Sequence, residues 1–102
     1  MQRDLAISLL QAHETELRAA GVEHVSVFGS VARDQAGPHS DVDVVVRLSP
    51  EAKRGGFAYF GRLADLKRQL EQILGCSVDL VVEPVQREAL RAAMDREAAL
   101  AF

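Results

Sequence analysis

Two nearby stretches, Phe28 to Arg33 (FGSVAR) and Ser40 to Leu48 (SDVDVVVRL), decide how this chain folds and where its chemistry lies. In the second stretch Asp41 and Asp43 alternate with apolar residues, which predicts a β-strand with one face in the core. Side chains at positions i and i+2 of a strand project from the same face, so both carboxylates can converge on one or two divalent cations. The alternation therefore predicts a strand from Asp41 to Leu48 that carries core residues on one face and chemistry on the other.

The first stretch predicts a strand that gives way to a short helix at a glycine. Val25, Val27 and Phe28 mark the strand, Gly29 ends it, Ser30 to Arg33 begin a brief helix, and the cluster Gly37 to Ser40 breaks that helix. A glycine at such a step lets backbone N–H groups approach a triphosphate, whose charge the helix N-terminus favours. Ser30 is therefore expected to hydrogen-bond a β or γ phosphate oxygen. Arg33 has two interpretations, because it would either steer phosphate or pair with a nearby carboxylate.

A third carboxylate lies on another short strand, Ser77 to Val82. Val78, Leu80 and Val82 form its apolar face, so Asp79 projects from the opposite face, as Asp41 and Asp43 do. Mg²⁺ prefers oxygen ligands, often one or two carboxylates together with substrate phosphates and water. We expect Asp41 and Asp43 to bridge two Mg²⁺ ions, and Asp79 to bind the ion nearer the attacking hydroxyl or to accept its proton.

The remaining apolar residues recur at helical spacing. They predict a first helix from about Arg3 to Ala20 with Gly21 as its C-cap, a second from Phe57 to Leu74 ended by Gly75, and a terminal helix. The positions expected to face inward are Leu5, Leu9, Leu10, His13 and Leu17; then Phe57, Phe60, Leu63, Leu66, Leu70, Ile73 and Leu74; and finally Leu90, Met94 and Ala98. Helices and strands together predict a single α/β (α+β) domain over residues 1–102.

Composition narrows the class of protein. The 102 residues are 48% hydrophobic and carry a net charge of −3, which argues against binding nucleic acid through its phosphates. No apolar run approaches the roughly 20 residues that a membrane span requires. Cys76 is the sole cysteine and cannot form an internal disulfide, and no signal-peptide pattern precedes the first helix, so we expect a cytoplasmic protein.

Three motifs in order carry a resemblance to a known family. Gly29-Ser30-x-Ala32-Arg33, Ser40-Asp41-x-Asp43 and Val78-Asp79-Leu80-Val81 together resemble the minimal nucleotidyltransferases of the MNT type. The resemblance covers almost the whole chain and implies the nucleotidyltransferase fold, a small mixed β-sheet flanked by helices.

The resemblance also implies a role for each motif residue. Gly29 and Ser30, with Arg33 and Ser40, would hold the nucleotide, Asp41 and Asp43 the magnesium ions, and Asp79 the third catalytic place. Asp34 stands where family members often have glycine, which changes the local charge of that turn.

Small members of the family are typically antitoxins paired with a HEPN-domain ribonuclease toxin. The resemblance implies that this chain transfers AMP from ATP to a tyrosine of that toxin and so inactivates it. Two other functions remain open: neutralisation of the toxin by steric cover alone, and nucleotidyl transfer to RNA or a small molecule. The acidic charge balance counts against RNA, and the absence of a second domain counts against an antibiotic.

Contact with the partner is expected at one of two places. Tyr59 lies off the expected apolar stripe of the second helix and would present itself to a partner, as would the apolar end Leu100 to Phe102. The alternative for that end is packing against the core.

Overall fold

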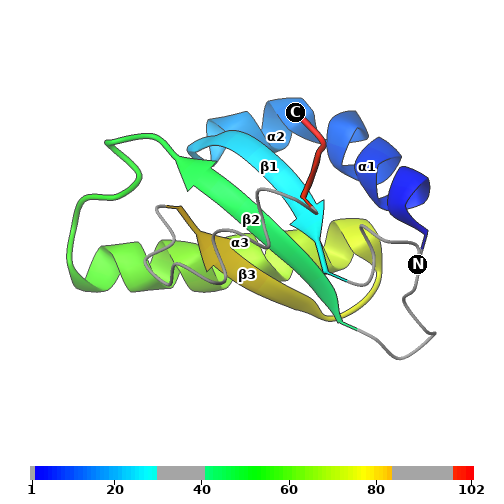
Figure 1. The fold of residues 1–102 in the computed structure, drawn as a ribbon. Helices are drawn as coiled ribbons and strands as arrows, with labels where there is room; N and C mark the ends of the chain where they lie inside the picture. Colours follow the sequence, from blue (N-terminus) through cyan, green and yellow to red (C-terminus); the bar gives the residue numbers. More distant parts are fainter. Residues whose placement is uncertain (1, 30–40, 84–97) are drawn as a thin grey trace.

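A computed structural model describes residues 2–29, 41–83 and 98–102, and its centre is a four-stranded sheet of order β3-β2-β1-β4 (Figure 1). The strands are β1 (Val22–Phe28), β2 (Val42–Leu48), β3 (Val78–Val82) and β4 (Ala99–Leu100). β1 is antiparallel to both β2 and β4, whereas β2 and β3 are parallel. The predicted mixed sheet of an α/β fold is thus confirmed.

The parallel pair is joined by a helix, because parallel neighbours need a crossover connection. Helix α3 (Phe57–Leu74) leaves the end of β2 and returns the chain to the start of β3. The two strands then pair without a register shift, from Val42 opposite Val78 to Val46 opposite Val82. This crossover brings the two predicted carboxylate strands side by side.

The helices lie together on one face of the sheet. Helices α1 (Arg3–Ala12) and α2 (Glu14–Ala19) pack on β1, and α3 packs on β3 and on α1 (Figure 1). The core between helices and sheet holds Ala6, Leu10, Leu17, Val22, Val25, Val27, Val42, Val44, Val46, Leu48, Leu66, Leu70, Leu74, Val78 and Ala101. Alternate strand residues therefore leave the helix-covered face and point to the other side of the sheet.

The first predicted helix is in fact two helices. His13 has φ −109° and donates its amide hydrogen to the Leu10 carbonyl at 3.1 Å, a tighter turn than the α-helical pattern. Leu10 in α1 and Leu17 in α2 are buried as expected, but the prediction for Leu5 is wrong, because 51% of it is exposed. Ala6 faces the core instead. Leu5, one residue earlier, is turned away from that direction by about 100° around the helix axis.

Helix α3 begins and ends at the predicted residues, and Gly75 follows it in the left-handed conformation at φ 72°. Its first turn, however, faces the other way from the prediction. Phe57 is 95% exposed and Phe60 67%, whereas Tyr59 packs against the core. The reason is helical geometry. Tyr59 stands almost two full turns before the buried Leu66 and so faces the same side of the helix, whereas Phe57 and Phe60 face other directions.

The C-terminal end forms a strand, where a helix was expected to continue through Ala98. Ala98 is exposed and precedes β4, so its predicted inward position is wrong, and Leu90 and Met94 lie outside the described residues. Ala101 is buried and donates to the Val25 carbonyl at 2.8 Å, and the Val25 amide donates to Phe102 at 3.1 Å. The end is thus packed against the core, the second of the two alternatives.

In the described parts of the chain, no helix is both long and apolar enough to cross a membrane.

Candidate active site

The central feature of the site is a pair of aspartates on neighbouring strands. Asp43 of β2 stands directly opposite Asp79 of β3 in the parallel ladder. Their sequence neighbours Val42, Val44 and Val78 are buried under the helices, so the two aspartates belong to the opposite face. Asp43 is half-buried and Asp79 is exposed, and the structure thus brings these two predicted carboxylates together.

Asp41 lies one residue before β2, outside the strand that was predicted to include it. The residue is exposed and stands near the start of β3. Burial raises the pKa of the Cys76 thiol above its ordinary value, and the nearby carboxylates of Asp41 and Glu71 raise it further. Because Asp41 directly precedes Val42, which is paired with Val78, it lies at the same end of the β2–β3 pair as Asp43 and Asp79.

Gly29 presses its backbone against the Asp43 carboxylate. It follows the last residue of β1, Phe28, which is paired with Asp43 across the antiparallel ladder. A Cβ atom at Gly29 would overlap with Oδ2 of Asp43, and the φ of Gly29 is 73°, a value that L side chains rarely adopt. The predicted glycine is thus required twice, for its conformation and for the room it leaves.

Phe28, Val45 and Val81 form a small apolar cluster on the same face as the aspartates, and none of the three was predicted to belong to the site. Phe28 and Val45 are buried, and Val81 packs against them. The signal was present in the alternation, because Val45 shares the strand face of Asp43 and Val81 that of Asp79. This cluster therefore borders the two aspartates along the same face of the sheet.

Three predicted site residues, Ser30, Arg33 and Ser40, lie outside the described residues. Within residues 2–29, 41–83 and 98–102, no group of three or more His, Cys, Asp or Glu side chains is arranged to hold a metal ion. The pair Asp43 and Asp79 still supplies the hard oxygen donors that Mg²⁺ prefers, and that ion commonly completes its shell with phosphate and water.

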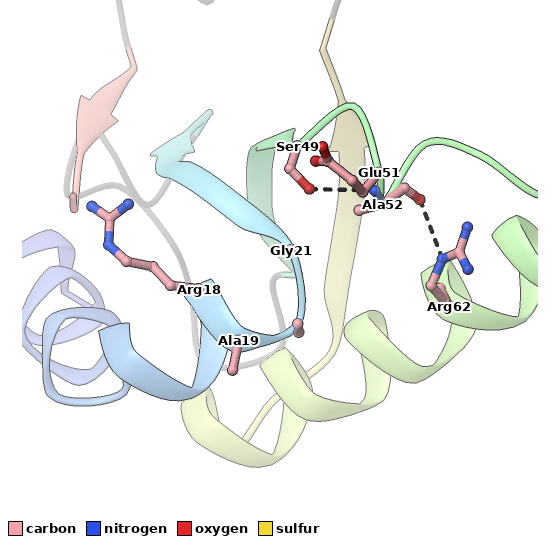
Figure 2. Close-up of a pocket in the computed structure, with 8 residues that line it drawn as sticks. Arg18, Ala19, Gly21, Ser49, Glu51, Ala52 and Arg62 are labelled. Carbon is pink, nitrogen blue, oxygen red and sulfur yellow. Dashed lines mark hydrogen bonds between the residues drawn. The ribbon is translucent and has the colours of Figure 1, made fainter.

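A pocket of about 370 Å³ opens at the other end of the strands, where β1 begins and β2 ends (Figure 2). Its lining comprises Arg18, Ala19, Ala20, Gly21, Ser49, Glu51, Ala52 and Arg62. Both arginines of the lining interact with other residues of the chain. Arg62 donates Nε–H to the Ala52 carbonyl at 3.2 Å, and Arg18 forms an ion pair with Glu14 at 2.7 Å. In Figure 2 the guanidinium of Arg18 points away from the Ser49–Ala52 turn. Because it lies at the opposite end of the strands, this pocket is separate from the pair Asp43 and Asp79.

Comparison with known proteins relates this chain to a protein family. The family model described as "Nucleotidyltransferase domain" matches residues 10–99. Protein adenylyltransferase MntA of Thermococcus cleftensis is 34% identical over 91 residues, which are 88% of this chain and 86% of that protein.

Solved structures with a similar fold belong to proteins of the same kind. One described as a minimal nucleotidyltransferase superposes with a TM-score of 0.75 at 33% identity and covers 97% of this chain and 95% of its own. An MNT antitoxin solved in complex with the tri-AMPylated HEPN toxin of Shewanella oneidensis has a TM-score of 0.60 at 18% identity, with 94% of this chain and 71% of the other covered. At 18% identity, the similarity to this second structure is evidence for the fold alone.

Proposed function

This chain belongs to the nucleotidyltransferase domain family, and from that membership we propose that it transfers AMP from ATP to a HEPN-domain ribonuclease toxin and so acts as its antitoxin. The observation that carries the proposal is the pairing of Asp43 with Asp79, with Gly29 packed against Asp43. The matched relative from Thermococcus cleftensis is a protein adenylyltransferase, and the structural neighbour from Shewanella oneidensis is bound to an AMPylated toxin.

The reaction is a displacement at the α-phosphorus. A hydroxyl oxygen of the toxin, which we propose to belong to a tyrosine, forms a bond to that phosphorus while the bond to the leaving pyrophosphate breaks. The hydroxyl proton must leave as the oxygen attacks. We propose that Asp79, on the edge strand of the described sheet, accepts that proton or binds the cation beside the oxygen.

We propose that Asp41 and Asp43 hold two Mg²⁺ ions. Bound there, these cations would neutralise the charge of the phosphates and of the departing pyrophosphate. The half-buried position of Asp43 strengthens its electrostatic interactions, because water screens a buried charge less than an exposed one. Gly29, with Ser30, Arg33 and Ser40, would hold the nucleotide.

We also propose that residues 1–102 act as one domain in the cytoplasm, where ATP is at hand. The family model spans residues 10–99, and one sheet joins segments from both ends of that span. The net charge of −3 counts against RNA as the acceptor.

The test is the intact mass of the HEPN partner after incubation with this protein, Mg²⁺ and ATP. The unaltered protein should add whole AMP units. Asp41→Asn with Asp43→Asn should slow the transfer by about 10²-fold or more, because charge stabilisation at the phosphates is lost. Asp65→Asn is the matched control, since Asp65 is exposed on α3 and pairs with Arg68.

Steric cover is the competing function, and the same samples distinguish it. If no mass were gained while both the unaltered protein and the double variant still neutralised the toxin, the chain would be a binding antitoxin and not an enzyme.

A further inference from the structure

One residue of α3, Glu71, binds the turn between α3 and β3 at both of its ends. The Glu71 carbonyl accepts the Gly75 amide hydrogen at 2.8 Å, where the helix stops. Its side-chain Oε2 accepts the amide hydrogen of Val78, the first residue of β3, at 3.1 Å. The turn is thus closed by the backbone and the side chain of a single residue.

The Val78 amide needs such a partner because β3 is the edge strand of the described sheet. On the side facing β2, the Ser77 carbonyl accepts the Val42 amide hydrogen at 3.0 Å. Successive backbone groups along a strand point to opposite sides, so the Val78 amide points away from β2. The Glu71 carboxylate thus accepts a hydrogen bond from the Val78 amide, which cannot bond to β2.

The anchored residue is the direct neighbour of Asp79. Val78 stands opposite Val42 and Asp79 opposite Asp43, so the position of Val78 along β2 sets where Asp79 meets Asp43. The far end of β3 is held by the amide of Glu83, which donates to the Val46 carbonyl at 2.9 Å. At the end near Asp79, the side-chain oxygen of Glu71 is the acceptor that holds the strand.

We propose that Glu71 is a positioning residue, which anchors Val78 and so holds Asp79 opposite Asp43 in the reactive arrangement. The inference rests on the proposed function, because it gives Asp79 its role in AMP transfer. Glu71 belongs to α3, which packs on the face of the sheet opposite Asp79, so we give it no role in contact with the reacting atoms. Its effect passes through the backbone of β3.

The experiment compares Glu71→Gln, which keeps a side-chain oxygen acceptor, with Glu71→Met, which has similar bulk and no such acceptor. Gln72→Met is the matched control, because Gln72 is the exposed next residue of the same helix. Amide hydrogen exchange at Val78 and Asp79 is measured by NMR on the unliganded protein. Exchange should become about tenfold faster in Glu71→Met and remain near the unaltered rate in Glu71→Gln and Gln72→Met.

Kinetics of AMP transfer to the HEPN partner then link the anchor to the reaction. Glu71→Met should lower kcat about tenfold while KM for ATP changes by less than about twofold, and Glu71→Gln should restore kcat. In a background of Asp79→Asn, Glu71→Met should cause no further loss, since the residue it positions is gone.

Two results would overturn the proposal. An equal fall of kcat in the Gln and Met variants would point to the charge of Glu71 instead of its hydrogen bond. The same fall in the Asp79→Asn background would show that Glu71 supports the fold in general. Failure of the unaltered protein to transfer AMP would contradict the proposed function, and exchange at Val78 and Asp79 would still decide whether Glu71 anchors β3.

Discussion

Gly29 is the position at which the site leaves no room for a side chain. Replacement by alanine places a Cβ against Oδ2 of Asp43 and forces alanine to a φ of 73°. We expect Gly29→Ala to lower the free energy of unfolding by about 1 kcal/mol through backbone strain. We also expect the rate of AMP transfer to fall by about tenfold or more, because the carboxylate must move. Chemical denaturation and the intact-mass assay measure the two effects.

Gly56 provides the control for Gly29. It also has a positive φ, of 55°, but nothing lies within 4 Å of the Cβ that a substitution would add. Gly56→Ala should therefore cost similar stability and leave the transfer rate near that of the unaltered protein. Equal rates for the two alanine variants would show that the contact between Gly29 and Asp43 has no part in the reaction.

At the residue scale the sequence predicts much of the site, for identifiable reasons. Alternation along Ser40 to Leu48 and Ser77 to Val82 is enough to put Asp43 and Asp79 on a face away from the core. It does not reveal that the two stand opposite each other. That depends on the turn after α3, whose length and hydrogen bonds have no periodic signature.

Among the elements, α3 shows how hydrophobicity and burial can differ. Leu70 is fully buried, whereas Phe60, the larger residue, is 67% exposed. We expect Leu70→Ala to lower the free energy of unfolding by about 2–5 kcal/mol, because it opens a cavity in the core. Phe60→Ala should change it by about 0.5 kcal/mol or less, as is usual at exposed sites. Thermal or urea unfolding of the two variants measures the difference, and a larger loss for Phe60→Ala would contradict the described packing.

The bounds of α3 could be predicted from sequence, but the direction of its first turn could not. Gly75 marks the end plainly, since a glycine in the left-handed conformation commonly follows a helix. Phe57 and Phe60 look like core residues by type, and only their angular offset from Leu66 and Leu70 shows otherwise.

Strand β4 was missed for a different reason. It is two residues long and forms through backbone hydrogen bonds to β1, so it has no alternating pattern to recognise. The break at His13 between α1 and α2 is similar, because a change of hydrogen-bond partner by one residue leaves the helical spacing of leucines almost intact.

For the whole molecule, the end of the chain contributes to stability. The Gln11 side chain donates to the Ala101 carbonyl at 2.9 Å, and the Arg18 guanidinium lies 4.9 Å from the centre of the Phe102 ring. Removal of Ala101 and Phe102 also breaks their backbone bonds to Val25. We expect a loss of about 2–4 kcal/mol in the free energy of unfolding, summed over these contacts.

Leu100→Ser is the control for this truncation, because Leu100 is 62% exposed and its backbone pairing with Ser26 is retained. It should change the free energy of unfolding by about 0.5 kcal/mol or less. Denaturant titration compares both forms with the unaltered protein, and equal stability of the truncated form would exclude a structural role for the packed end.

The turn from Gly75 to Ser77 also limits how the length of this protein can change. Because side chains alternate along a strand, one extra residue in that turn would put Asp79 on the helix-covered face and a core valine in its place. A pair of extra residues would restore the face but displace the carboxylate along β2. The loop from Ser49 to Gly56 leads into a helix and has no such odd-or-even constraint. Insertions should thus accumulate before α3 in related chains, while the connection after it keeps its length.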